Sequence, residues 1–278
     1  MSLSTALKFM CFVLAVLASV VSVKAGGAPG KGTEGIASGA TLRFTILYDN
    51  YLYKEGTRAD WGFSCLIEGL DKTILFDTGT DPRILMHNVE ALNVDLKKVD
   101  LVVITHNHGD HTGGLAAFLE RKPDVPVYFP VSFPAEFARR VESLGGRPRT
   151  VDKPLEICDH VHLTGELGEA IVEQSLVIDT PQGLVVVTGC SHPGIVKILR
   201  RAREIVDKPI ALVFGGFHLG NMKDADVEAI IAEFKSLGVE RCGATHCTGD
   251  RPIALFKKAF GENYVPMGTG RVIEVPGF

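Results

Sequence analysis

A predicted strand that runs into a cluster of potential metal ligands constrains the fold of this chain more than any other feature. The apolar run from Val99 to Ile104 predicts a short buried strand. Four side chains able to bind a cation follow it directly, namely His106, His108, Asp110 and His111. In layered α/β folds, the loops that leave the carboxyl ends of buried strands converge on the ligand crevice. The segment therefore predicts a layered α/β protein with a site at this strand end.

The same arrangement recurs in the second half of the chain. Apolar strands predicted at Leu184 to Thr188, Ile210 to Phe214 and Arg241 to Ala244 each run into a loop that carries a histidine, and these are His192, His218 and His246. Helices are predicted from helical spacing of apolar residues at Pro82 to Leu92, Gly113 to Arg121, Pro134 to Leu144, Gly194 to Val206 and Asp224 to Leu237. Near the start, three strands with turn signals between them, expected to be antiparallel, are predicted at Leu42 to Tyr48, Ser64 to Glu68 and Lys72 to Phe76. A further strand is predicted at Val125 to Phe129, and a strand-rich stretch is expected after Leu144, through His160 to Leu163 and Ser175 to Asp179.

The ligand spacing predicts two neighbouring cations. Residues two apart in an extended segment point the same way, so His106 and His108 can share one cation. Asp110 and His111 follow a turn at Gly109 and can face a second cation. Imidazole nitrogens and a carboxylate suit zinc and comparable divalent ions, and ligand type does not separate zinc from iron or manganese.

Composition indicates one globular domain. Of 278 residues, 46% are hydrophobic and 22% are charged, which is enough apolar material for a sizeable core. We expect a single domain over residues 41–278. The net charge of −4 gives no basic surface for nucleic acid, so the expected partner is a small-molecule substrate.

The N-terminus predicts export. Lys8 precedes an apolar run from Phe9 to Val23, and small residues follow at a possible cleavage position, so residues 1–25 are interpreted as a signal peptide. An uncleaved membrane anchor is the alternative. Residues 26–40 are rich in Gly, Ala and Ser and are expected to form a flexible leader. The mature protein would be periplasmic or extracellular, without stable membrane contact once the signal is cleaved.

The string from Thr105 to His111, followed by Thr-Gly-Gly, resembles the H-x-H-x-D-H signature of the metallo-β-lactamase superfamily. The resemblance implies a four-layer αβ/βα sandwich of two mixed sheets flanked by helices. It implies that Asp77, in Phe-Asp-Thr-Gly, orients the ligand loop by hydrogen bonding. It also implies that His246, in Thr-His-Cys-Thr-Gly, completes the shell of the second metal.

The middle motif departs from the superfamily pattern. Cys190 stands where a metal-bridging aspartate is expected, and His192 follows two residues later. We expect His192 to be a ligand, whereas Cys190 is either a ligand or a buried small hydrophobe. For His218, metal binding, substrate contact and a packed core position are all open. The loops at Asp49 to Gly62 and Pro130 to Arg149 are expected to shape the pocket.

Hydrolysis by a metal-bound hydroxide at a carbonyl or phosphoryl centre is the expected reaction. In this interpretation His106, His108 and His192 hold one metal, and Asp110, His111 and His246 hold the other, with Asp110 also able to take up a proton. The motifs look most like the branch of the dihydropterin ribofuranosyl-aminobenzene phosphate synthases, which implies a metal-dependent transferase as the alternative. That branch usually has histidine where this chain has Trp61. A metal-binding protein without turnover is a further alternative.

Overall fold

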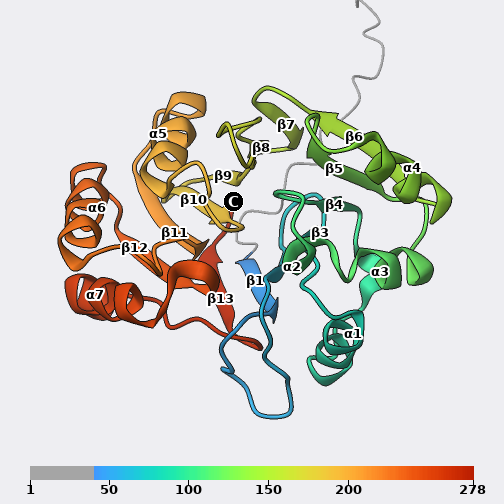
Figure 1. Ribbon diagram of the computed structural model, residues 1–278, viewed down its shortest axis with the longest axis horizontal. Coiled ribbons are helices and arrows are strands. Elements are labelled where there is room, and N and C mark those ends of the chain that lie inside the picture. The colour runs from blue at the N-terminus through green and yellow to red at the C-terminus, as the bar shows by residue number, and fades with distance from the viewer. Residues whose placement is uncertain (1–40) are drawn as a thin grey trace, which may run out of the picture. The chain divides into compact units, whose positions relative to one another are not determined.

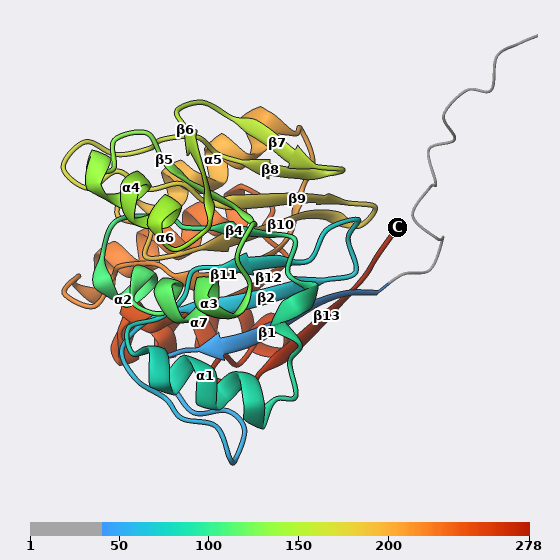
Figure 2. The ribbon, with the colours of Figure 1, turned by 90° about the vertical axis from the view of Figure 1, so that its right-hand side faces the viewer.

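A computed structural model describes residues 41–278 of the chain, so the predicted signal peptide and leader lie outside the described residues. Two β-sheets face each other in this part of the chain (Figures 1 and 2). The described residues contain no helix that is long and apolar enough to cross a membrane.

The first sheet has seven strands in the order β13-β1-β2-β3-β4-β5-β6. The pairs from β13 to β3 are antiparallel, and those from β3 to β6 are parallel. The strands are β1 (Thr41–Tyr48), β2 (Ser64–Glu68), β3 (Ile74–Phe76), β4 (Leu101–Val103), β5 (Pro126–Pro130), β6 (Arg147–Val151) and β13 (Val272–Pro276).

The second sheet has six strands in the order β12-β11-β10-β9-β8-β7. Strands β10, β11 and β12 are parallel, and the remaining neighbours are antiparallel. The strands are β7 (Leu155–Cys158), β8 (Val161–Leu163), β9 (Leu176–Thr180), β10 (Gly183–Thr188), β11 (Ile210–Gly216) and β12 (Arg241–Thr245).

Strand β10 packs into a different apolar cluster on each face of its sheet. All its residues are buried, and successive side chains point to opposite faces of the sheet. Val185 and Val187 pack into the core between the sheets, where Phe44 and Phe214 also meet edge to face with ring centroids 5.1 Å apart. Leu184 and Val186 pack on the opposite face against the helices. A strand covered on both faces is therefore apolar throughout.

Helices cover the outer face of each sheet, on opposite sides of the view in Figure 1. Helix α5 buries Ile195, Ile198, Leu199 and Ala202, which form one helical stripe against the second sheet. Beside the first sheet lie α1 (Pro82–Ala91), α2 (Gly109–Thr112), α3 (Leu115–Arg121) and α4 (Ala135–Ser143), and on the second sheet lie α5 (Ile195–Ile205), α6 (Asp224–Ser236) and α7 (Asp250–Phe260). The four-layer αβ/βα sandwich expected from the resemblance is confirmed.

Most predicted elements are present, with differences at a few places. The helix expected at Gly113 to Arg121 is present as α3 but begins two residues later, at Leu115. A separate turn of helix that was not predicted, α2, precedes it from Gly109 and contains Asp110 and His111. Strands β6 and β7 lie in the stretch expected to be strand-rich but were not predicted as separate strands, and β13 and α7 were not predicted.

Candidate metal centre

The site lies where the carboxyl ends of strands from both sheets meet. His106 and His108 follow β4, and Asp110 and His111 lie on the first turn of α2. From the second sheet, Cys190 and His192 follow β10, whereas His246 begins a single 3-10 turn (His246–Thr248) after β12. Each ligand candidate is therefore placed by a rigid strand end rather than by a long free loop.

One set of side chains consists of His106, His108 and His192. One ring nitrogen from each lies within 4.8 Å of the others, and Nε2 of His106 is 3.1 Å from Nδ1 of His108. Nε2 of His192 is buried and has no hydrogen-bond partner among the described residues. A buried polar atom without a partner is costly unless something binds it, so this nitrogen fits a cation between the three rings.

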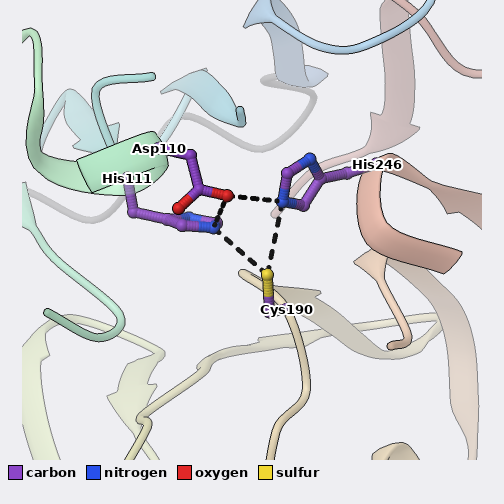
Figure 3. Close-up of side chains that lie close together, drawn as sticks. All are labelled: Asp110, His111, Cys190 and His246. Carbon is purple, nitrogen blue, oxygen red and sulfur yellow. Dashed lines mark hydrogen bonds and ion pairs between the residues drawn. The ribbon is translucent and has the colours of Figure 1, made fainter. Parts of the chain in front are cut away.

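A second set consists of Asp110, His111, Cys190 and His246, which converge from three elements (Figure 3). The Cys190 sulfur lies 3.2 Å from Nε2 of His111 and 3.3 Å from Nε2 of His246. Oδ2 of Asp110 lies 3.3 Å from Nε2 of His246 and 3.6 Å from Nε2 of His111. Donors crowded at these distances around one point fit a tetrahedral cation.

Asp77 orients His106 and His111 through contacts on their Nδ1 side, directly for His111 and through Thr105 for His106. Its Oδ2 accepts from Nδ1 of His111 at 2.7 Å and from the Thr105 hydroxyl at 2.8 Å. The same hydroxyl is 2.9 Å from Nδ1 of His106, so it can accept that proton while donating to Asp77. In the neutral form of each ring, these contacts place the proton on Nδ1 and leave an unprotonated Nε2 toward the site. Asp77 itself belongs to neither ligand set.

Asn50 orients His246 in a comparable way. Its Oδ1 is 2.9 Å from Nδ1 of His246 and also accepts from the backbone N–H of Gly62 at 3.0 Å. Sequence reasoning missed this residue, although its place just after β1 was a possible signal.

Glu173 is a second functional candidate that the sequence analysis missed. It is fully buried, and its carboxylate accepts backbone N–H groups from Cys190 and Ser191 at 2.9 Å and from His192 at 2.8 Å. Burial raises the pKa of Glu173 to about 7. The side chain holds the Cys190 to His192 loop in place, and no local motif marks it in the sequence.

Burial and neighbouring charges set the protonation of the rings. Burial and the adjacent imidazoles lower the pKa of His106 far below its usual range, and burial together with His218 lowers the pKa of His192 to about 4. Burial opposes the charged form of His111 as well, but the Asp77 carboxylate outweighs it and raises the pKa of His111 to about 9. A cation at the second set would therefore displace a proton from His111.

His218 lies beside the two sets and is solvent-exposed, so it is not a packed core residue. Its ring centroid is 4.3 Å from that of His192. Its Nδ1 or Nε2 also lies within 4.8 Å of the sulfurs of Cys190 and Cys247. Cys247 lies inside the Thr-His-Cys motif, but no role was predicted for it from the sequence.

A cavity of about 750 Å³ opens on this side of the site. Trp61 forms part of its wall and lies against His246, with ring centroids 5.0 Å apart. A smaller cavity of about 360 Å³ borders His108 on the other side and is lined partly by Ser132, Phe133 and Pro134. The two loops expected to shape a pocket thus each contribute to one of these cavities.

The comparisons with known proteins agree with this geometry. Residues 62–193 match the family profile described as the metallo-β-lactamase superfamily. The chain is 29% identical to the 7,8-dihydropterin-6-methyl-4-(β-D-ribofuranosyl)-aminobenzene-5'-phosphate synthase of Methanocaldococcus jannaschii, over 83% of this chain and 95% of that protein.

Solved structures share the fold. Tm1679, described as a metal-dependent hydrolase of the β-lactamase superfamily, is 29% identical, with a TM-score of 0.72 over 84% of this chain and 99% of that one. A diphosphatase from the PhnP family has a TM-score of 0.58 at 14% identity, over 85% of this chain and 98% of that one, a likeness that concerns the fold alone.

Proposed function

The chain belongs to the metallo-β-lactamase superfamily, and from this premise we propose that it is a hydrolase that uses two divalent metal ions on a carbonyl or phosphoryl centre. His106, His108 and His192 would hold the first ion, and Asp110, His111, Cys190 and His246 the second. The role of Cys190 as a ligand, left open by the sequence, is part of this proposal.

The adjacency of the two donor sets is the observation that carries the proposal. The rings of His106 and His111, one from each set, have centroids 4.2 Å apart. Imidazole, carboxylate and thiolate donors together favour zinc over magnesium or calcium, which prefer oxygen ligands. Two such ions in one site lower the pKa of water toward neutrality and polarise the oxygen of the substrate.

The side chains of the protein prepare this chemistry. Asp77, Thr105 and Asn50 hold the rings of His111, His106 and His246 through Nδ1, so these three rings need not reorient when a cation binds at Nε2. Burial opposes ionisation of Asp110, but its contacts with His246 and His111 lower its pKa well below the usual range, so its carboxylate stays ionised and available as a donor.

The larger cavity gives the expected place of a small-molecule substrate. Trp61 is 56% exposed and Met222 is 43% exposed, so both offer apolar surface beside polar groups such as Asn50. Cavities of this kind bind a ligand through apolar contact and orient it through a few polar groups. We propose that the non-reacting part of the substrate packs against Trp61.

Metal analysis and activity profiling test the proposal together. We expect the full chain to retain two ions at the two sets and to hydrolyse a member of a panel of esters, lactones, β-lactams and phosphodiesters. His106→Ala and His246→Ala should each lose activity by at least about 10²-fold while the fold persists, because each removes a metal ligand. His162→Ala, on strand β8 and outside both ligand sets, is the matched control and should keep full activity. Full turnover in either ligand variant would contradict the assignment.

The relative from Methanocaldococcus jannaschii favours a second candidate, a metal-dependent transferase. Incubation with a dihydropterin that carries a pyrophosphate leaving group and a ribofuranosyl-aminobenzene phosphate would then give a condensed product and free pyrophosphate, whereas the hydrolase would give no condensed product. Bound metal without turnover in either assay would indicate the third alternative, a metal-binding protein that is not an enzyme.

A further inference from the structure

Three side chains beside the two ligand sets form a cluster of their own. These are Cys190 at the end of β10, His218 after β11 and Cys247 in the 3-10 turn after β12. One ligand atom from each lies within 4.8 Å of the others. Only Cys190 also belongs to the second set, and neither His218 nor Cys247 has a part in the proposed reaction.

We propose that Cys190, His218 and Cys247 form a third cation site for a thiophilic ion such as Zn²⁺. The inference goes beyond the proposed function and shares with it only Cys190, whose thiolate would bridge the second and third ions. Binding would release the protons of the two thiols to solvent, since only thiolates ligate.

The donor chemistry and spacing fit such an ion. Two sulfurs and an imidazole nitrogen are a ligand set that favours zinc or another soft ion over magnesium, calcium or manganese. Tetrahedral zinc with Zn–S bonds of about 2.3 Å separates two sulfur ligands by about 3.8 Å. The observed separations of at most 4.8 Å therefore need only small side-chain rotations.

The Cys247 sulfur lies close to the backbone of Gly216. A Cβ atom added at Gly216 would lie 2.7 Å from this sulfur, so only glycine leaves room for it at that position. The thiol donates a weak hydrogen bond to the Cys190 carbonyl at 3.4 Å, a contact that deprotonation would remove.

The surroundings of Cys247 differ from those of the cysteines that only pack in the core. Cys65 and Cys242 are fully buried and pack within apolar clusters. Cys247 instead is half-buried and lines the larger cavity together with His218. A third ion held there would keep an open coordination position toward that cavity, where a substrate atom or water could bind.

A metal-counting experiment on the full chain tests the third site. The reduced protein is loaded with Zn²⁺, freed of excess ion and analysed for metal, and the same is done with Co²⁺ to record thiolate-to-cobalt charge-transfer absorption. We expect three ions per chain, falling to two in Cys247→Ser and in His218→Ala. The charge-transfer band should weaken in Cys247→Ser. Cys158→Ser, which alters a thiol on β7 remote from the site, is the matched control and should keep three ions and the full band.

The possible outcomes separate the two proposals. Two ions in both the unchanged protein and Cys247→Ser, with equal cobalt spectra, would overturn the third site and leave the dinuclear centre intact. No bound ion would overturn both. A disulfide between Cys190 and Cys247 would also contradict the third site, since a disulfide sulfur is not a thiolate ligand. It would be detected if the protein, after refolding and removal of the reductant, had two free thiols fewer than its number of cysteines. Circular dichroism of each variant checks that the fold persists.

Discussion

Four residues of the site hold a left-handed backbone that only glycine adopts freely. The φ angles are 53° at Asp77, 66° at Ser191, 54° at His218 and 51° at His246. Each such residue costs on the order of 1–3 kcal/mol, which the surrounding contacts must offset. Among these contacts, Asp77 is held by the Thr105 backbone N–H at 2.8 Å, and His246 by Asn50. Two of the four, His218 and His246, carry candidate metal ligands, and Asp77 and Ser191 lie in the loops that support the ligands.

At this scale, Asp77→Asn should weaken metal binding by roughly 10–100-fold. The amide either places an N–H against Nδ1 of His111 or turns that N–H toward the Thr105 backbone donor. In the first case, His111 avoids two opposed N–H groups by moving its proton from Nδ1 to Nε2. This removes the Nε2 lone pair that faces Asp110 and Cys190. Competition with a chromophoric chelator measures the affinity.

Asp95→Asn is the matched control for this substitution. Asp95 caps a short 3-10 helix at the surface by accepting from the Lys97 backbone N–H, away from the metal centre. Its variant should bind metal as the unchanged protein does. Equal affinities for both variants would show that Asp77 does not position His111.

At the scale of elements, the sequence predicts central strands better than edge strands. Strands β4, β10 and β11 lie inside their sheets, and their apolar runs predicted them and the ligands at their ends. Strands β13, β6 and β7, which the sequence analysis missed, all lie at a sheet edge. An edge strand is covered less and can carry charge and proline, as the sequence Arg-Pro-Arg-Thr-Val of β6 does, so it shows no apolar run.

Helix α7 and the two residues that support the ligands, Asn50 and Glu173, were not predicted, for different reasons. Pro252 near the start of α7 suggests a loop, although proline is tolerated in the first turn of a helix. Asn50 lies 196 positions from His246 in the chain, and Glu173 reaches the Cys190 loop from a preceding segment without a motif. Such contacts are created by tertiary packing, and one sequence carries no local sign of them.

The turn of α2 is locked to the loop after β3 by backbone contacts. The Gly113 N–H donates to the Gly79 carbonyl at 2.9 Å, and the Thr78 N–H donates to the His111 carbonyl at 2.8 Å. A Cβ atom at Gly113 would lie 1.9 Å from the Thr80 carbonyl oxygen. We therefore expect Gly113→Ala to lower the free energy of unfolding by at least about 2 kcal/mol, because backbone must move.

Gly109 provides the control within the same helix. A Cβ atom there would meet nothing within 4 Å, so Gly109→Ala should change the free energy of unfolding by less than about 0.5 kcal/mol. Urea unfolding of both variants, followed by circular dichroism, gives the comparison. If the two variants were equally stable, the claim that Gly113 lies too close to the Thr80 carbonyl to carry a side chain would be wrong.

At the scale of the whole described domain, the metal centre joins the two sheets. His106 follows a strand of the first sheet, whereas His192 and His246 follow strands of the second. Each proposed ion would therefore draw ligands from both halves of the sandwich. Among the buried side-chain atoms of the two sets, Nε2 of His192 is without a hydrogen-bond partner, and a bound ion would satisfy it.

Chelation should accordingly lower the melting temperature of the whole domain. An ion that binds only the folded state adds about 2.7 kcal/mol of stability when present at 100 times its Kd. For a domain of this size, 1 kcal/mol corresponds to roughly 2–4 °C, so we expect each ion to contribute about 5–10 °C. Scanning calorimetry with excess chelator, and again after Zn²⁺ is restored, measures the shift. In His246→Ala the shift should be smaller, because the second set has lost a ligand. Identical melting with and without chelator would mean that the two halves of the sandwich are not joined through bound ions, and that the unpaired nitrogen of His192 has another explanation.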